Sequence, residues 1–331
     1  MHYVAIDEGS AGQRLDNFLV KLLKGVPKSH VHRVIRSGEV RVNQGRAGAD
    51  TRLALGDRIR VPPVRVAAPR SDGDGFATVP ARHFTVLFED EHLIAIDKPA
   101  GVAVHGGSGV SFGVIEQLRR ARPDEKLLEL VHRLDRETSG VLLVARKRTS
   151  LVALQDQLRR RDPQLAKTYL ALVRGAWPAR LKVIDVALHK YLSAEGERRV
   201  RVVEADHEAA RRSISLVKVV RRFAAFTLLE VTIKTGRTHQ IRVHLADAGH
   251  PIVGDSKYGD FELNKALARG VPWLGVRVTT NRYSGMFLHA ARLRIVHPAS
   301  GDPLELAAPL PAECTSFLDT LLQWPDTAAS I

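Results

Sequence analysis

The chain has 331 residues, 44% hydrophobic and 26% charged, a composition typical of a globular protein with one large core and a smaller domain. Lysine and arginine total 50 against 36 aspartate and glutamate, and the formal charge of +14 favours polyanionic partners without choosing among RNA, DNA and an anionic membrane. The single cysteine excludes an internal disulfide and a cysteine-pair zinc site. No stretch approaches the roughly 20 apolar residues that a membrane-spanning helix needs, so we expect a cytoplasmic protein without membrane contact.

Two short helices are predicted near the N-terminus. The apolar residues of the first recur at the spacing of one buried helix face: Leu15, Phe18, Leu19, Leu22 and Leu23. Gly25 and Pro27 then interrupt the chain, and we expect Ser29 to cap a second helix. Its inner face is formed by Val31, Val34 and Ile35, and its polar face carries Lys28, Arg33 and Arg36.

Short strands follow the two helices. The fragments VRV (40–42) and RIRV (58–61) alternate like strands and are separated by residues that favour turns. Residues 1–66 contain 12 Lys or Arg and 6 Asp or Glu, a net charge of +6. The order of helix, basic helix, GEVRVN and GDRIRV resembles the αL RNA-binding domain named after ribosomal small-subunit protein four.

This resemblance implies that Lys28, Arg33 and Arg36 contact RNA. The alternative is that these charges only keep the exposed face of a helix in solvent, as most charge runs do.

Residues 67–80 are short of large apolar side chains and rich in Ala, Gly and Pro, so we predict a linker there, followed by a second domain over 81–331. This domain begins with a predicted hairpin (86–90 and 93–97) and continues with alternating strands and helices. The further expected helices are 112–122, 149–161 and one from about 238, and the further strands are 141–145, 167–173 and 226–234. Short turns between neighbouring strands predict an α+β fold with a mixed, mostly antiparallel sheet and flanking helices.

The loop HRLDRETSG (132–140) contains a candidate reactive carboxylate. Asp135 lies between Arg133 and Arg136, whose charges favour the ionised form that suits a nucleophile or a base. From these residues alone, a surface ion-pair cluster is the more usual interpretation of an aspartate among arginines.

Three later phrases complete a pattern: GRTHQIRVHL (236–245), HPIVGDSKYG (250–259) and LHAARLRIVHP (288–298). With HRLDRETSG, they occur in the order seen in the ribosomal large-subunit pseudouridine synthase A family, which the chain resembles over about residues 84–310. A subgroup of that family also carries the αL domain in front. The resemblance implies the pseudouridine synthase catalytic fold with its bent sheet, and isomerisation of specific uridines in 23S ribosomal RNA, either free or in the pre-ribosomal large subunit.

The resemblance also implies the roles of individual residues. Asp135 matches the catalytic aspartate, and Arg133 matches an arginine that fills the gap left by the flipped-out base. Tyr169 matches the tyrosine that packs on the base and assists proton removal. Arg237 matches the arginine that ion-pairs with the aspartate. No metal or small-molecule cofactor is implied, because the reaction changes no redox state and adds no atom, and we expect a monomer.

Other candidate sites fail on spacing. His239 and His244 are five residues apart, about 140° around a helix, so we interpret them as polar helix residues and not as a metal-binding pair. Cys314 near an apolar run is expected to be a buried structural thiol. Two functions from other classes remain open: an assembly factor that only binds RNA, and an RNA methyltransferase, which would need a glycine-rich cofactor fingerprint that the sequence lacks.

Overall fold

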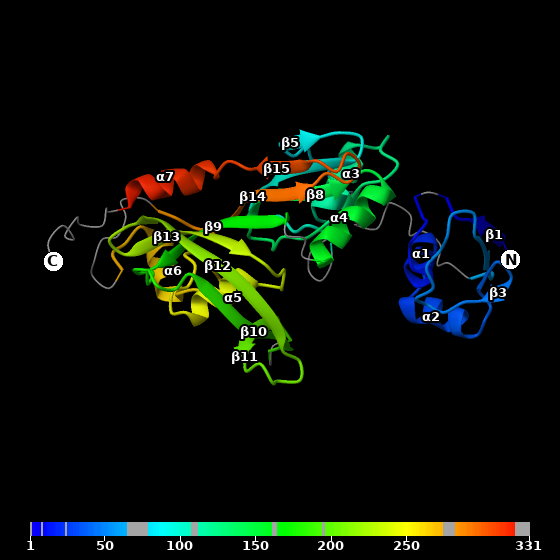
Figure 1. Cartoon of the computed structure of the whole chain (residues 1–331), viewed down its shortest axis with the longest axis horizontal. Helices are drawn as coiled ribbons and strands as arrows, with labels where there is room; N and C mark the ends of the chain where they lie inside the picture. The colour runs from blue at the N-terminus through cyan, green and yellow to red at the C-terminus, as the bar shows by residue number, and fades with distance from the viewer. Residues whose placement is uncertain are drawn as a thin grey trace.

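The computed structural model describes residues 2–7, 9–23, 25–64, 79–106, 112–160, 164–193, 196–273 and 282–321. Figure 1 shows a small N-terminal unit at one end of the molecule and a larger unit that contains the remaining elements. The predicted linker lies outside the described residues except for positions 79 and 80.

The N-terminal unit combines two helices with a four-stranded antiparallel sheet in the order β1-β4-β2-β3. Its elements are β1 (His2–Ala5), α1 (Leu15–Leu22), α2 (Lys28–Arg36), β2 (Arg41–Val42), β3 (Gly45–Arg46) and β4 (Arg58–Val61). Both helices and the strands at 41–42 and 58–61 confirm the prediction, whereas β1 was not foreseen. The inner face of α2 is buried against α1, as expected.

The predicted cap of α2 is wrong. The helix begins at Lys28, with Pro27 as the residue before it, and no side chain caps it. Proline fixes the backbone angle φ at −57° here, which prepares the chain to enter the helix without a capping hydroxyl. Ser29 therefore lies inside the first turn.

The larger unit is built on an eleven-stranded sheet in the order β11-β10-β12-β13-β9-β14-β8-β6-β5, with β15 beside β14 and β7 beside β8. Its strands are β5 (Val86–Glu89), β6 (Leu93–Lys98), β7 (Glu129–Leu130), β8 (Ser139–Ala145), β9 (Ala166–Arg174), β10 (Val183–Leu192), β11 (Arg198–Val203), β12 (Arg211–Arg222), β13 (Phe226–Ile233), β14 (Leu288–Val296) and β15 (Pro303–Ala307). Among the described strands, β8 and β14 form the one parallel pair, so the prediction of a mixed, mostly antiparallel sheet is confirmed.

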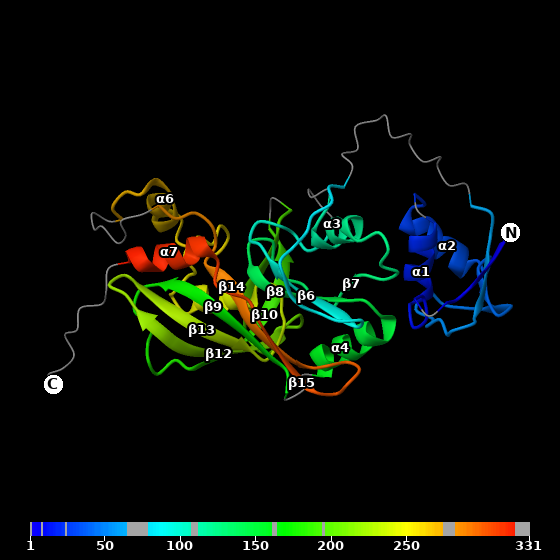
Figure 2. The same ribbon diagram turned by 90° about the horizontal axis from the view of Figure 1, so that it is seen from above.

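Helices cover both faces of this sheet. They are α3 (Val114–Ala121), α4 (Arg148–Arg160), α5 (Gln240–Asp247), α6 (Phe261–Arg269) and α7 (Ala312–Thr320). Figure 2 shows α3 and α4 on opposite sides of β6 and β8, since alternate residues of each strand face opposite sides. In β9, likewise, Leu172 packs with α6 and α7, and Ala171 and Val173 pack with α5.

Two strands approach each other closely at Gly140, the last residue of the motif HRLDRETSG. Gly140 has a φ of 107°, and a Cβ atom there would lie 2.3 Å from the carbonyl oxygen of Ala290. Only glycine tolerates both conditions. The loop before β8 is thus tied closely to β14.

Two further expectations concern single features. Cys314 is buried beside Phe317, which confirms the expected buried thiol, and burial raises its pKa to about 11. In the part of the chain that the structure describes, no helix has the length and apolar character needed to cross a membrane.

Candidate active site

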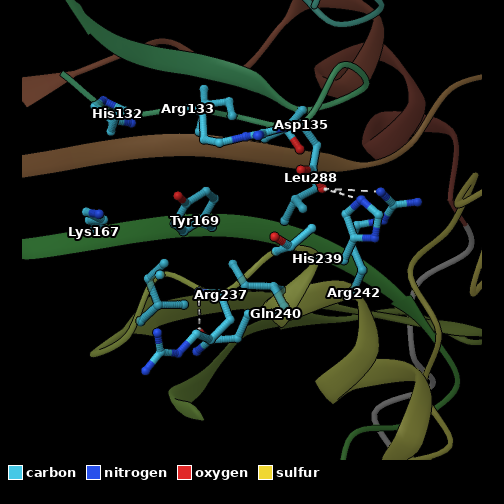
Figure 3. Close-up of a pocket in the computed structure, with 16 residues that line it drawn as sticks. His132, Arg133, Asp135, Lys167, Tyr169, Arg237, His239, Gln240, Arg242 and Leu288 are labelled. Carbon is cyan, nitrogen blue, oxygen red and sulfur yellow. Dashed lines mark hydrogen bonds and ion pairs between the residues drawn. The ribbon is translucent and has the colours of Figure 1, made fainter. Parts of the chain in front are cut away.

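A cavity of about 240 Å³ opens where the loop before β8, the strand β9 and the turn before α5 meet. It is lined by His132, Arg133, Leu134, Asp135, Thr138, Lys167, Tyr169, Ile233, Gly236, Arg237, Thr238, His239, Gln240, Ile241, Arg242 and Leu288. Two of the recognised motifs, HRLDRETSG and GRTHQIRVHL, therefore contribute facing walls of one cavity (Figure 3).

Asp135 is held by Arg242. The Nη1 atom of Arg242 donates a hydrogen bond of 3.2 Å to Oδ2 of Asp135, and the aspartate side chain is 21% exposed. No other side chain among the described residues donates a hydrogen bond to it. Since a carboxylate can accept about four hydrogen bonds, Asp135 keeps free lone pairs that face the cavity.

The orientation of Arg242 comes from a second carboxylate. Nε and Nη2 of Arg242 donate to the two oxygens of Asp255, each at 2.7 Å. Oδ1 of Asp255 also accepts from the backbone N–H groups of Lys257 and Tyr258, at 2.8 and 3.0 Å. Asp255 is fully buried and fully hydrogen-bonded, so the guanidinium has one orientation before any substrate binds.

These contacts keep the buried pair ionised. Burial alone would raise the pKa of Asp255, but the hydrogen bonds and charge of Arg242 hold that pKa below its usual value. Burial also acts against the charge of Arg242, yet the hydrogen bonds and charge of Asp255, and then those of Asp135, raise its pKa. The cation beside Asp135 is permanent.

A buried lysine supports the loop that carries Asp135. Lys98, at the end of β6, is fully buried, and its ammonium donates to the carbonyl oxygens of Pro99, Val102 and Arg136 at 2.8, 2.8 and 3.1 Å. All three N–H donors are used. Because Arg136 directly follows Asp135, this ammonium fixes the backbone beside the carboxylate.

The strand β9 supplies two side chains from one face, Lys167 and Tyr169. Burial, followed by the charge of Asp135, raises the pKa of the Tyr169 hydroxyl, which stays protonated at neutral pH. Burial lowers the pKa of Lys167 to about 8. No carboxylate lies within 4.0 Å of the Lys167 ammonium in the described segments, so it faces the cavity as an unpaired cation.

Two histidines line the cavity in neutral form. Burial, and then the charge of Lys167, lowers the pKa of His132 to about 3, and its Nε2 accepts a hydrogen bond of 3.1 Å from the N–H of Leu143. Burial also lowers the pKa of His239, whose Nε2 lies 3.7 Å from Oδ2 of Asp135. At neutral pH this second contact is therefore not an ion pair.

The predicted partner of Asp135 is wrong. Arg237 lines the same cavity, but its exposed side chain extends away from Asp135, whereas Arg242 and His239 reach toward it (Figure 3). The cause is local. His239 adopts the left-handed backbone conformation, φ 53°, and the helix α5 begins only at Gln240. Arg242 then lies on the turn of α5 that faces the aspartate.

The other predicted residues fall in two places. Arg133, Asp135 and Tyr169 are brought together in the cavity, with Arg133 exposed. Lys28, Arg33 and Arg36 are all exposed on α2 of the N-terminal unit. His239 is a cavity residue and not a polar helix position, and His244 is completely buried.

Four residues of the site were not predicted from the sequence: Arg242, Asp255, Lys167 and Lys98. Arg242 and Asp255 lie inside recognised motifs, so the signal was present but not assigned to a side chain. Within the described residues, no cluster of three or more His, Cys, Asp or Glu side chains could hold a metal ion.

Comparison with known proteins gives consistent matches. The RNA pseudouridylate synthase family model matches residues 92–247, and the S4 domain model matches residues 13–59. The chain is 47% identical to the ribosomal large subunit pseudouridine synthase C of Salmonella typhi, over 96% of each protein. It is 48% identical to the protein of that name from Escherichia coli K12, over 93% of this chain and 92% of the other. The solved structure of human RNA pseudouridylate synthase domain containing 4 is similar with a TM-score of 0.55 at 25% identity, over 71% of this chain and 92% of that chain.

Proposed function

Since the chain belongs to the RNA pseudouridylate synthase family, we propose that it isomerises specific uridines of large-subunit ribosomal RNA to pseudouridine, with Asp135 as the catalytic carboxylate. The expected order of an S4-type domain ahead of a pseudouridine synthase fold is confirmed. The observation that carries the proposal is the hydrogen bond from Arg242 to a carboxylate that otherwise faces an open cavity.

The reaction needs few protein groups. The bond from the sugar carbon C1′ to N1 of uracil breaks, the base turns, and C1′ bonds to C5 of the same base. C5 releases a proton and N1 gains one, so atoms balance and the redox state does not change. Asp135 can serve by attacking the sugar, by attacking the base ring, or by acting as a base on the sugar. In each case Arg242 lies beside it as a fixed cation, 3.2 Å from Oδ2.

The target base must leave its stack to reach Asp135. Unstacking costs a few kcal/mol and is cheapest in a loop or bulge. In this proposal Arg133, at the exposed side of the cavity, fills the gap that the base leaves. Tyr169 packs on the base. Its hydroxyl is protonated in the free enzyme, so it assists proton removal as a neutral relay and not as a phenolate.

The N-terminal unit binds RNA outside the cavity in this proposal. Lys28, Arg33 and Arg36 fall within an arc of about 140° on α2, opposite its buried face. A basic surface of this kind contacts phosphates and positions the substrate. We further propose that the protein acts in the cytoplasm, as a monomer and without a cofactor, on 23S ribosomal RNA or on the pre-ribosomal large subunit.

The test uses ribosomal RNA labelled with tritium at C5 of uridine, because the reaction releases that hydrogen to water. Asp135→Asn should abolish tritium release while RNA affinity stays within a few fold. The matched control is Glu137→Gln, which removes a carboxylate from the same loop, where Glu137 pairs with Arg136 at 2.7 Å. The control should retain turnover. Activity of Asp135→Asn, or no missing pseudouridine in ribosomal RNA after deletion of the gene, would refute the proposal.

A further inference from the structure

A second cavity adjoins the candidate active site. It has a volume of about 330 Å³, and its walls come from β10, β11, the start of β12 and the turn before α5. The two cavities share three residues of that turn, Gly236, Arg237 and Thr238. A volume of this size matches the lower end of the range for small-ligand sites.

The lining of this second cavity is cationic. Lys190, Arg211 and Arg237 line it together with apolar and neutral residues, and no aspartate or glutamate contributes to its walls. Within the part of the chain that the structure describes, none of these three cations has a carboxylate within 4.0 Å. Three unpaired cations around one hollow repel each other, and an anion between them would remove that cost.

Neighbouring cations on the same strands behave differently. Arg212, the next residue after Arg211, pairs with Asp185. On β11, Arg199 pairs with Glu197 at 3.1 Å, and Lys257 contacts the same glutamate at 2.6 Å. Carboxylates thus neutralise some of the cations around this cavity, whereas none lies within 4.0 Å of the three cations that line it.

The position of Arg237 links the two cavities. Its side chain extends away from Asp135 (Figure 3), so the motif residue that was expected beside the carboxylate lies at the boundary with the second cavity. An RNA chain is continuous. When one nucleotide enters the first cavity, the backbone on either side of it continues outside, and the shared turn gives it a route into the second cavity.

We propose that this second cavity, here called the flanking pocket, binds a backbone phosphate next to the target uridine of the substrate RNA. The assignment rests on the proposed function. Lys190, Arg211 and Arg237 supply the charge, and guanidinium groups can hold phosphate oxygens with two parallel hydrogen bonds. This contact fixes the strand while the target base turns in the neighbouring cavity.

The test replaces single phosphates of the RNA. A short large-subunit RNA fragment that the wild-type protein modifies is prepared with a neutral methylphosphonate at one linkage at a time, over three linkages on each side of the target. For the wild type we expect one linkage, or two adjacent ones, to weaken affinity and kcat/KM about tenfold, the effect of losing a charge-assisted hydrogen bond.

The protein variant for this test is Lys190→Gln/Arg211→Gln. It should bind the unmodified RNA about tenfold more weakly than the wild type and lose much less than tenfold at the sensitive linkage, where only Arg237 remains. The matched control, Lys182→Gln/Lys218→Gln, removes the same charge from exposed positions outside the pocket, one just before β10 and one on β12. It should keep the tenfold sensitivity of the wild type. All four side chains are exposed, so folding should be unaffected, and thermal denaturation checks this.

The possible failures are distinguishable. If the wild type forms pseudouridine but no linkage near the target is sensitive, the flanking pocket assignment is wrong and the proposed function stands. Equal behaviour of the pocket variant and the control variant would also refute the pocket. If the wild type forms no pseudouridine in any ribosomal RNA, both proposals fall together.

Discussion

Arg242 joins two carboxylates that differ in their burial. Asp255 is fully enclosed, whereas Asp135 is 21% exposed. The enclosed carboxylate takes two of the hydrogen bonds of the guanidinium and fixes its plane. One N–H then remains directed at Asp135. The stability of the buried pair and the orientation of Asp135 therefore depend on the same side chain.

We expect Arg242→Gln to lower the free energy of unfolding by about 3–5 kcal/mol, because Asp255 would lie buried without a counter-charge. Tritium release should also be lost, because Asp135 loses its hydrogen-bond donor. Thermal denaturation measures the first effect and tritium release the second.

A double variant separates these two effects. In Arg242→Gln/Asp255→Asn two neutral amides replace the buried ion pair, so much of the stability should return. Turnover should not return, because Asp135 still lacks its cation. Near-normal turnover of the double variant would show that Arg242 acts only as a structural residue.

Lys167 predicts an alkaline limit to activity. Its pKa is lowered to about 8 by burial, so its ammonium loses the proton above that pH. In the proposed function, the cavity that it lines takes the target nucleotide, whose carbonyl and phosphate oxygens a cation attracts. We expect kcat/KM of the wild type to fall about tenfold per pH unit above pH 8.

The comparison for this pH profile is Lys167→Met, which has no proton to lose. It should have a lower kcat/KM than the wild type at pH 7, and its kcat/KM should not begin to fall near pH 8. Ionisation of the uridine base affects both proteins equally, so the difference between the profiles isolates the lysine. Parallel profiles would contradict a role for the Lys167 charge.

For single residues, the sequence predicted which motifs lie together at the cavity. It did not predict which side chain of a motif contacts Asp135. Arg237 and Arg242 are five residues apart in one phrase, and the choice between them depends on where the helix α5 starts. We expected it from about residue 238, and the left-handed conformation of His239 delays it to Gln240. No composition rule predicts a positive φ at a histidine.

At the scale of elements, β6 and the loop before β8 are joined by the buried ammonium of Lys98. Burial lowers the pKa of Lys98 to about 8, against an ordinary value of 10.5. Between these two pH values the unfolded chain binds more protons than the folded protein, so this group makes the protein more stable as the pH rises. Keeping Lys98 charged below pH 8 costs about 3 kcal/mol.

We therefore expect the melting temperature of the wild type, relative to Lys98→Met, to increase between pH 8 and pH 10. The variant should also lose turnover at pH 7.5, because the carbonyl of Arg136 beside Asp135 is released. Differential scanning calorimetry across this pH range gives the first result and tritium release the second. If the two melting profiles stay parallel and turnover is normal, Lys98 does not position the loop.

About half of the described strands and helices were predicted from the sequence with their bounds, whereas none was assigned for β10, β11, β12, β14, β15, α6 or α7. Apolar runs such as VLLVA lie in β8, whose seven residues are all buried, and the hairpin of β5 and β6 matches its predicted bounds closely. The strand β1 was missed. Only four residues long and mostly exposed, it is held by pairing with β4 across more than fifty residues of sequence, and a local pattern carries no signal for such a partner.

At the scale of the whole molecule, the N-terminal unit has a hydrophobic core of its own, formed by residues between 4 and 64. Two contacts with the larger unit are a hydrogen bond of 3.1 Å from Arg148 to the carbonyl of Ala11 and an ion pair of 3.7 Å between Lys21 and Glu129. Exposed ion pairs of this kind add at most about 1 kcal/mol. The larger unit should therefore fold without its partner.

Deletion of residues 1–75 should leave a folded synthase that binds RNA more weakly. Residues 1–66 carry a net charge of +6, and each phosphate contact that is lost should reduce the slope of log affinity against log salt by about 0.7 to 0.9. Turnover at saturating RNA should change little, because every residue of the candidate active site lies after position 131.

Lys28→Gln/Arg33→Gln/Arg36→Gln in the full chain should reproduce most of the change in slope, since these three cations are exposed on α2. Filter binding at several salt concentrations gives the slopes, and an unchanged affinity and slope after the deletion would mean that the N-terminal unit does not bind the substrate.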